Sequence, residues 1–240
     1  MEQVINRRSM MGSVLAVGAA GAAGLFGGAA PAAAAAAAGK SGGDELSTVI
    51  LSELHQGVRE MVVRPGPGAR RFAGALRTYA AHGRARGLDQ AVAKYYRDLV
   101  AVQGRDAVLL AEPDWGYIRA EAQKLGVDNI TPTPIDMAAR GRALDAVLAG
   151  KYTAFLDVVA KDCDTRSRRL DERNVQGLRP IVDYDGPCIA TMEMENWASI
   201  VSRFVCATSF VIWGDVPVCA AATGAWIGVW VVNQASGCHA

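Results

Sequence analysis

The sequence predicts an all-α protein, in which a helical N-terminal domain is followed by a disulfide-stapled hydrophobic helical hairpin. From residue 44 to residue 163, apolar residues recur at intervals of three and four, which is the spacing of one face of an α-helix. No convincing alternation of apolar and polar residues indicates a β-strand. The last 53 residues hold four of the five Cys and four of the five Trp but only four charged side chains, which sets them apart as an apolar region.

The composition of the 240 residues excludes several classes of protein. Lys and Arg number 25 and Asp and Glu number 24, so no basic excess favours nucleic acid as a partner. An apolar content of 51% excludes a generally disordered chain. The charge is distributed unevenly: residues 40–187 have 22 basic and 20 acidic side chains, whereas residues 188–240 have one and three.

Residues 1–39 have the features of an export signal. The pair Arg7 and Arg8 precedes a mildly apolar stretch rich in Gly and Ala, and small residues follow at positions that suit cleavage. Adjacent arginines in this context resemble a twin-arginine signal. An N-terminal membrane helix is the alternative, but the small-residue tract suits cleavage better than anchoring. We therefore expect a secreted protein that is exported by the twin-arginine pathway.

Six helices are expected in the domain formed by residues 40–163. Asp44 is a suitable N-cap for the first helix, and the segment 65–68 is expected to end that helix. Gly104 is expected to interrupt the third helix, Pro113 suits the first turn of the fourth, and Gly150 ends the fifth. The expected ranges are 44–63, 70–82, 88–111, 113–126, 135–149 and 152–163.

This domain lacks a recognisable constellation for catalysis or metal binding. His55 and His82 are isolated and fit no metal-ligand spacing. Neither a Gly-Lys-Ser phosphate loop nor a Gly-x-Ser-x-Gly nucleophile elbow is present. Asp136 and Asp145 share a helix, but no other feature makes them a catalytic pair. We expect no enzymatic activity, no catalytic residues and no resident cofactor or metal.

Arginines are concentrated in one part of the domain. They could contact an anionic lipid or an acidic partner. We favour a solvated face, because nearby acidic residues balance their charge. The residues are Arg64, Arg70, Arg71, Arg77, Arg84 and Arg86.

Residues 164–187 combine charges of alternating sign with Gly and Pro near their end. One interpretation is an exposed polar helix followed by a turn. The other is a charged linker that a protease can enter. If the tail is released, we expect its new N-terminus between Asp164 and Cys188.

The tail, residues 188–240, is expected to form two antiparallel helices. Apolar and polar residues segregate to opposite sides in residues 188–213, with Glu195 on the polar side, which predicts an amphipathic helix. The segment 214–217 contains Gly, Asp and Pro and is expected to turn the chain. Residues 218–232 are apolar on every side, and Asn233 is expected to help end this helix.

The four cysteines of the tail limit its disulfide pairing. A straight helix of 18 residues is ~27 Å long, whereas bridged Cα atoms lie about 6 Å apart. Cys188 therefore cannot pair with Cys206 along an intact helix, nor Cys219 with Cys238. A hairpin favours the nested pairs Cys188–Cys238 and Cys206–Cys219, and export makes an oxidised state plausible. Cys163 is left either as a free core thiol or as a competitor for Cys188.

The apolar helix of the tail has three interpretations. It could complete the core of the helical domain, form a membrane-active module, or act as a permanent anchor, which we favour least. Gly224 and Gly228 share a face and permit close contact with another helix. In a membrane-active tail, aromatic rings would lie at the membrane interface. These would be Trp197, Phe204, Phe210, Trp213, Trp226 and Trp230.

Three short segments of the tail carry a resemblance to a known family. They are Phe204-Val205-Cys206, the apolar stretch through Val216-Pro217-Val218 to Cys219, and the apolar stretch that ends in Ser236-Gly237-Cys238. The tail resembles the C-terminal domain of halocin-type bacteriocin precursors. This resemblance implies a twin-arginine signal, an N-terminal part assigned to self-immunity, and a hydrophobic, Cys-rich peptide that is released as the antimicrobial.

The resemblance and the residue pattern lead to one functional expectation. We expect an exported bacteriocin-like precursor whose tail acts on target cell membranes, with the helical domain shielding the tail until release. The alternative is a secreted helical structural or interaction protein in which the tail is part of the core.

Overall fold

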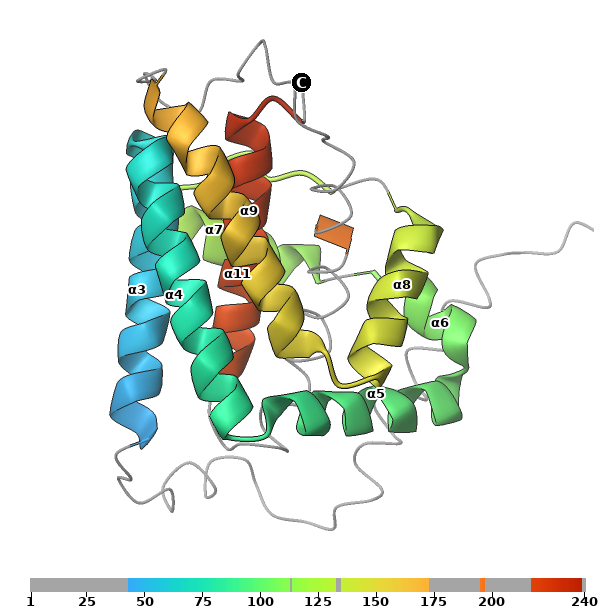
Figure 1. Ribbon diagram of the computed structural model, residues 1–240. Coiled ribbons are helices and arrows are strands. Elements are labelled where there is room, and N and C mark those ends of the chain that lie inside the picture. Colours follow the sequence, from blue (N-terminus) through green and yellow to red (C-terminus); the bar gives the residue numbers. More distant parts are fainter. Residues whose placement is uncertain (1–42, 113, 133–134, 173–194, 197–216, 239–240) are drawn as a thin grey trace, which may run out of the picture. The chain divides into compact units, whose positions relative to one another are not determined.

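The computed structural model describes residues 43–112, 114–132, 135–172, 195–196 and 217–238 (Figure 1). Within these residues the regular elements are all α-helices, which confirms the expected all-α class. The expected signal with Arg7 and Arg8 lies outside the described residues. The helices are α3 (Gly43–Val63), α4 (Pro65–Ala85), α5 (Leu88–Gln103), α6 (Arg105–Leu110), α7 (Trp115–Lys124), α8 (Met137–Leu148), α9 (Tyr152–Glu172) and α11 (Pro217–Ala235).

The break between α3 and α4 is shorter than the sequence predicts. Residues 65–68 were expected to lie outside both helices, but α4 begins at Pro65 and only Arg64 separates the two. Proline is compatible with a first helical turn, because the amide that it lacks has no partner within the helix there. Gly68 lies so close to the backbone of Met61 that a Cβ would not fit, which allows the chain to fold back tightly.

Gly104 divides the expected helix 88–111, as its position predicts. Helix α5 ends at Gln103 and α6 begins at Arg105. Gly104 has a φ of 84°, a backbone conformation that residues with a Cβ rarely adopt. The glycine therefore allows the change of direction between the two helices.

Aspartate side chains fix the starts of α7 and α8. The Asp114 carboxylate accepts a hydrogen bond from the amide of Tyr117 at 3.0 Å. Asp136 accepts from the amides of Ala138 at 2.9 Å and Ala139 at 3.1 Å. These bonds satisfy amides that have no partner within the first helical turn. Helix α7 therefore begins at Trp115, after Asp114, and Pro113 lies outside the described residues.

Four helices build the core of the described body. Helix α4 packs most extensively against α9 and α3, and α11 contacts all three of them as well as α7 (Figure 1). Helix α5 packs on α4 and α9 and carries α6 and α8. The large side chains that are completely enclosed include Leu54, Phe72, Tyr96 and Trp226. The expected interior stripes of α3, α4 and α5 thus meet one another and the apolar helix α11 in one core.

A ladder of ion pairs joins α4 to α9. Arg70 pairs with Asp171, Arg77 with Asp164, and Arg84 with Asp157 at 2.6 Å. The arginines are seven residues apart, and their aspartate partners descend by seven, as two antiparallel helices require. Arg71 pairs with Glu53 of α3 at 3.0 Å. Acidic residues of the same chain thus balance these four arginines.

Helix α9 continues nine residues beyond the expected end at residue 163. Residues 164–172 are therefore helical, which agrees with the interpretation of residues 164–187 as a polar helix followed by a turn. This part is only partly exposed, because Arg166, Ser167 and Leu170 are buried. The linker interpretation now concerns residues 173–187, which lie outside the described residues.

Candidate functional site around the buried C-terminal helix

Helix α11 is the apolar helix predicted in the tail, and it lies in the core against the helices of residues 43–172. Every residue from 221 to 233 is buried. Its neighbours are α3, α4, α7 and α9, so protein surrounds the helix on several sides (Figure 1). In the part of the chain that the structure describes, no helix has the length and hydropathy needed to cross a membrane. The apolar side chains of α11 are thus buried against protein in this conformation.

The two glycines of α11 allow other helices to approach it closely, as their spacing predicts. A Cβ on Gly224 would lie 2.5 Å from the Leu54 side chain of α3 and 3.3 Å from the ring of His55. A Cβ on Gly228 would overlap the Phe72 ring of α4. Both positions therefore have no room for a larger residue unless a neighbour moves.

Trp226 and Trp230 contact protein rather than solvent. Trp226 is 0% exposed and Trp230 is 4% exposed. The Trp226 indole N–H donates a hydrogen bond to the backbone oxygen of Glu195 at 3.2 Å, and its ring packs edge-to-face against Trp115, with centroids 5.4 Å apart. Contact of these two rings with a membrane would require α11 to leave the core. The other predicted membrane-contact residues, Trp197, Phe204, Phe210 and Trp213, lie outside the described residues.

A chain of buried polar side chains connects α9 to α11. The Arg166 guanidinium pairs with Asp162 at 2.9 Å and donates a hydrogen bond to Asn233 Oδ1 at 2.8 Å. Asn233 Nδ2 donates in turn to Glu195 Oε1. Arg166, Asn233 and Glu195 are 2%, 1% and 0% exposed, and polar groups that are buried to this extent require hydrogen-bond partners. Burial raises the pKa of the Asp162 carboxyl, although the Arg166 charge opposes this shift.

Residues 195–196 also contact the start of α8. Asn196 is buried, and its Oδ1 accepts a hydrogen bond from the amide of Asp136 at 3.1 Å. Asp136 is the N-cap of α8. This short segment therefore connects the start of α8 with the buried face of α11.

His55 lies at the contact between α3 and α11. It is half-buried, packs beside Gly224 and forms a hydrogen bond with the backbone of Ala220. Burial lowers the pKa of His55, and the nearby charges of Arg59 and Lys124 act in the same direction, whereas Glu121 opposes them. The histidine thus favours its neutral form in this interface.

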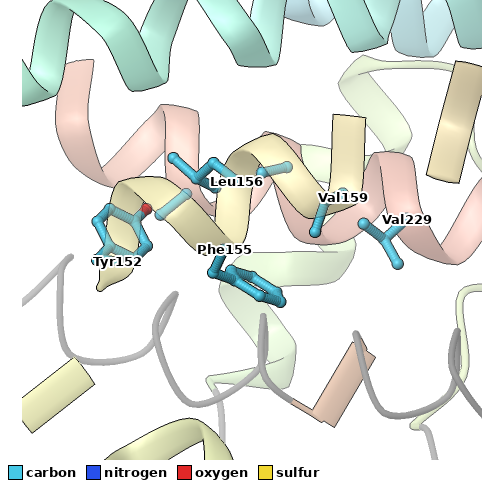
Figure 2. Close-up of a pocket in the computed structure, with 7 residues that line it drawn as sticks. Tyr152, Phe155, Leu156, Val159 and Val229 are labelled. Carbon is cyan, nitrogen blue, oxygen red and sulfur yellow. The ribbon is translucent and has the colours of Figure 1, made fainter. Parts of the chain in front are cut away.

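A small apolar recess lies between α9 and α11 (Figure 2). Phe155 and Val159 of α9 and Val229 of α11 are among its lining residues. Its volume of about 10 Å³ matches a single water-sized sphere. The recess is therefore too small to hold an organic substrate.

Cys163 is free and buried on α9. Burial raises the pKa of its thiol to about 12, so the reactive thiolate is scarce at neutral pH. Of the two alternatives for this residue, the free core thiol agrees with the structure. Cys188 and Cys206 lie outside the described residues, Cys219 lies in α11 without a described side chain, and Cys238 follows that helix, so the nested pairing stays a prediction.

The remaining polar candidates have structural partners. Asp145 forms an ion pair with Arg105 at 2.7 Å, and Asp136, which the sequence places on the same helix, is the N-cap of α8. Arg140 is buried, and its Nη1 donates hydrogen bonds to the backbone oxygens of Leu109 at 2.7 Å and Ala111 at 3.2 Å. Among the described residues, no group of three or more His, Cys, Asp or Glu side chains could hold a metal ion.

The buried polar chain was not predicted from the sequence. Asn233, Ser236 and Gly237 were expected to end the apolar helix, and α11 does end at Ala235, where Gly237 has a φ of 79° and the Asn233 carbonyl accepts from the amide of Cys238. What the sequence did not predict is that the Asn233 side chain bonds within the core. Glu195 was expected on the polar side of an amphipathic helix, yet it is completely buried. A single amide at the end of an otherwise apolar run is a signal that could have indicated a buried polar contact.

Comparisons with known proteins add no relative. No family model matches the chain, and no curated protein or solved structure shows a significant match.

Proposed function

We propose that the protein is an exported, bacteriocin-like precursor whose tail acts on target cell membranes after release from the helical body. One observation carries this proposal: a nearly uncharged helix, apolar on all sides, is kept out of water by the rest of the chain. The body, residues 43–172, supplies the contacts of α3, α4, α7 and α9 that enclose it. In this proposal the body shields the tail until release.

The physical argument concerns the fate of α11 outside the body. Burial of a large apolar side chain stabilises it by roughly 1.5–3 kcal/mol relative to exposure to water. Trp226, Ile227, Trp230 and Val231 are each at least 96% buried in the body. A released tail would therefore seek another apolar environment, and a membrane interface provides one.

The other parts of the proposal follow from the sequence. Arg7 and Arg8 would direct export through the twin-arginine pathway, which places the protein outside the cell. The nested disulfides Cys188–Cys238 and Cys206–Cys219 would keep the released hairpin folded. Six aromatic side chains would insert at the membrane interface. They are Trp197, Phe204, Phe210, Trp213, Trp226 and Trp230.

The decisive experiment applies the oxidised peptide 188–240 to bacterial cells and to dye-filled liposomes. We expect dye leakage and growth inhibition by the peptide, and little of either by the intact chain. A peptide with both Trp226→Ser and Trp230→Ser is the matched control and should release less dye. Absence of leakage and of growth inhibition across a panel of cells would rule out the membrane-active proposal.

A second candidate function is a secreted structural or interaction protein with α11 as a permanent core helix. The close contacts of Gly224 with Leu54 and of Gly228 with Phe72 favour it, because such fitted packing is typical of a stable core. Detection of only the intact mature chain in culture supernatant, by mass spectrometry, would support this function over the precursor.

A further inference from the structure

The polar chain between α9 and α11 divides into two halves that belong to different parts of the protein. Asp162 and Arg166 lie in α9, which belongs to the body, and form an i,i+4 ion pair. Glu195 and Asn233 both lie in the tail, where they are hydrogen-bonded to each other. The described link between the halves is the hydrogen bond from Arg166 Nη1 to Asn233 Oδ1, at 2.8 Å.

Asn233 is suited to this position because its amide both accepts and donates. Its oxygen accepts from a cation of the body, and its nitrogen donates to the carboxylate of Glu195. The two bonds fix the orientation of the amide, since a flipped amide would present N–H to Arg166 and oxygen to Glu195. A shift of α11 by one turn, ~5.4 Å, would remove the amide from both partners.

If α11 separates from α9 at the hydrogen bond between Arg166 and Asn233, each half of the polar chain keeps a partner. Arg166 keeps Asp162, and Glu195 keeps Asn233, so opening does not strand a buried charge. A misplaced α11, in contrast, would bury Arg166 and Glu195 against apolar side chains, and that arrangement is costly. The arrangement therefore discriminates against wrong registers and still permits opening.

We propose that Arg166, Asn233 and Glu195 form a separable latch, an autoinhibitory contact that holds α11 in one register against α9 and controls its release. This inference rests on the proposed function, because release has a purpose only if the tail acts elsewhere. Its physical content, the control of α11 opening by one amide, can be tested in the intact chain without any membrane. Figure 1 shows the segment 195–196, in orange, between α11 and α8, in agreement with its hydrogen bonds to Trp226 and Asp136.

The test reverses the donor and acceptor pattern of the latch. Asn233→Asp places a second carboxylate beside Glu195 and removes the hydrogen bond that Asn233 Nδ2 donates to Glu195 Oε1. Asn233→Asp combined with Glu195→Gln restores complementarity, because the new amide donates to one oxygen of Asp while Arg166 donates to the other. Gln234→Glu makes the same change from amide to acid at the adjacent, half-buried position and is the matched control.

The readout is amide hydrogen exchange of α11 in the intact protein, with α5, which packs on α4 and α9, as an internal reference. We expect α11 of the Asn233→Asp variant to exchange roughly 10- to 100-fold faster than in the native protein, because two carboxylates would face each other in a buried site. The double variant should return to the native rate or below it, and Gln234→Glu should stay near the native rate. An Asn233→Asp chain that fails to fold, beside a double variant that folds, supports the latch equally.

Two results would overturn the latch. In one, Asn233→Asp exchanges no faster than Gln234→Glu. In the other, the double variant is as impaired as the single one. Liposome leakage by the peptide 188–240 together with either of these results would leave the proposed function standing without its latch, and a functioning latch without leakage would mark α11 as a permanent core helix.

Discussion

At the residue scale, the contact between Gly228 and Phe72 sets a strict limit on side-chain size. We expect Gly228→Ala to destabilise the protein by ~1–3 kcal/mol, because the added methyl group overlaps the Phe72 ring in a packed core. Gly74→Ala is the matched control: it lies on the exposed side of α4 with open space around it, and alanine should stabilise that helix by up to ~1 kcal/mol. Denaturant unfolding of the two variants measures the difference, and equal stabilities would contradict the packing that we describe.

His55 makes the α3–α11 contact sensitive to acid. Burial lowers the pKa of His55 in the folded protein, so the unfolded chain takes up a proton first as the pH falls. The contribution of neutral His55 is therefore fully present above pH 6.5, its ordinary pKa, and is lost as the pH falls through the lower pKa of the folded state. Unfolding curves from pH 8 to pH 5 should show a smaller acid-induced loss for His55→Gln than for the native protein. Parallel pH profiles would show that another group causes the loss.

At the scale of elements, the ladder of ion pairs aligns α4 with α9. Arg77→Asp should weaken the helix pair, since it places a carboxylate opposite Asp164, and the exchange Arg77→Asp with Asp164→Arg should restore much of the loss. The pairs are partly exposed, so we expect only ~0.5–1 kcal/mol, and less at high salt. Unfolding at low and high salt gives the coupling between the two changes.

The matched control for the ladder is the exchange of Lys94 and Asp98. These residues form an exposed ion pair within α5 at 2.7 Å, so their reversal does not alter the contact between two helices. Its effect should be limited to a few tenths of a kcal/mol. A coupling between residues 77 and 164 no larger than this value would mean that the ladder does not help to align the helices.

At the scale of the whole molecule, local patterns were predictable and contacts between distant segments mostly were not. The periodicity of apolar residues located α3, a continuous apolar run located α11, and the Gly224–Gly228 spacing indicated a close helix contact. These signals depend on neighbours along the same helix. The partners of Asn233 come from positions far apart in the chain, and no local pattern encodes such pairing. The seven-residue spacing of the arginines on α4 is visible in the sequence, but two of their three partners, Asp164 and Asp171, lie in the segment interpreted as a possible linker.

The place of α11 in the core leads to a prediction for the whole body. A chain that ends before Pro217 loses the helix that contacts α3, α4, α7 and α9, and a cavity of that size cannot be closed by small adjustments. We expect such a chain to keep helical circular dichroism but to lose cooperative thermal unfolding and to bind a hydrophobic dye, as expanded states do. The control is a chain that ends at Cys238, which retains α11 and should unfold cooperatively. Cooperative unfolding of the shorter chain would show that the body is a stable fold without α11, and would contradict the central place in the core that we assign to this helix.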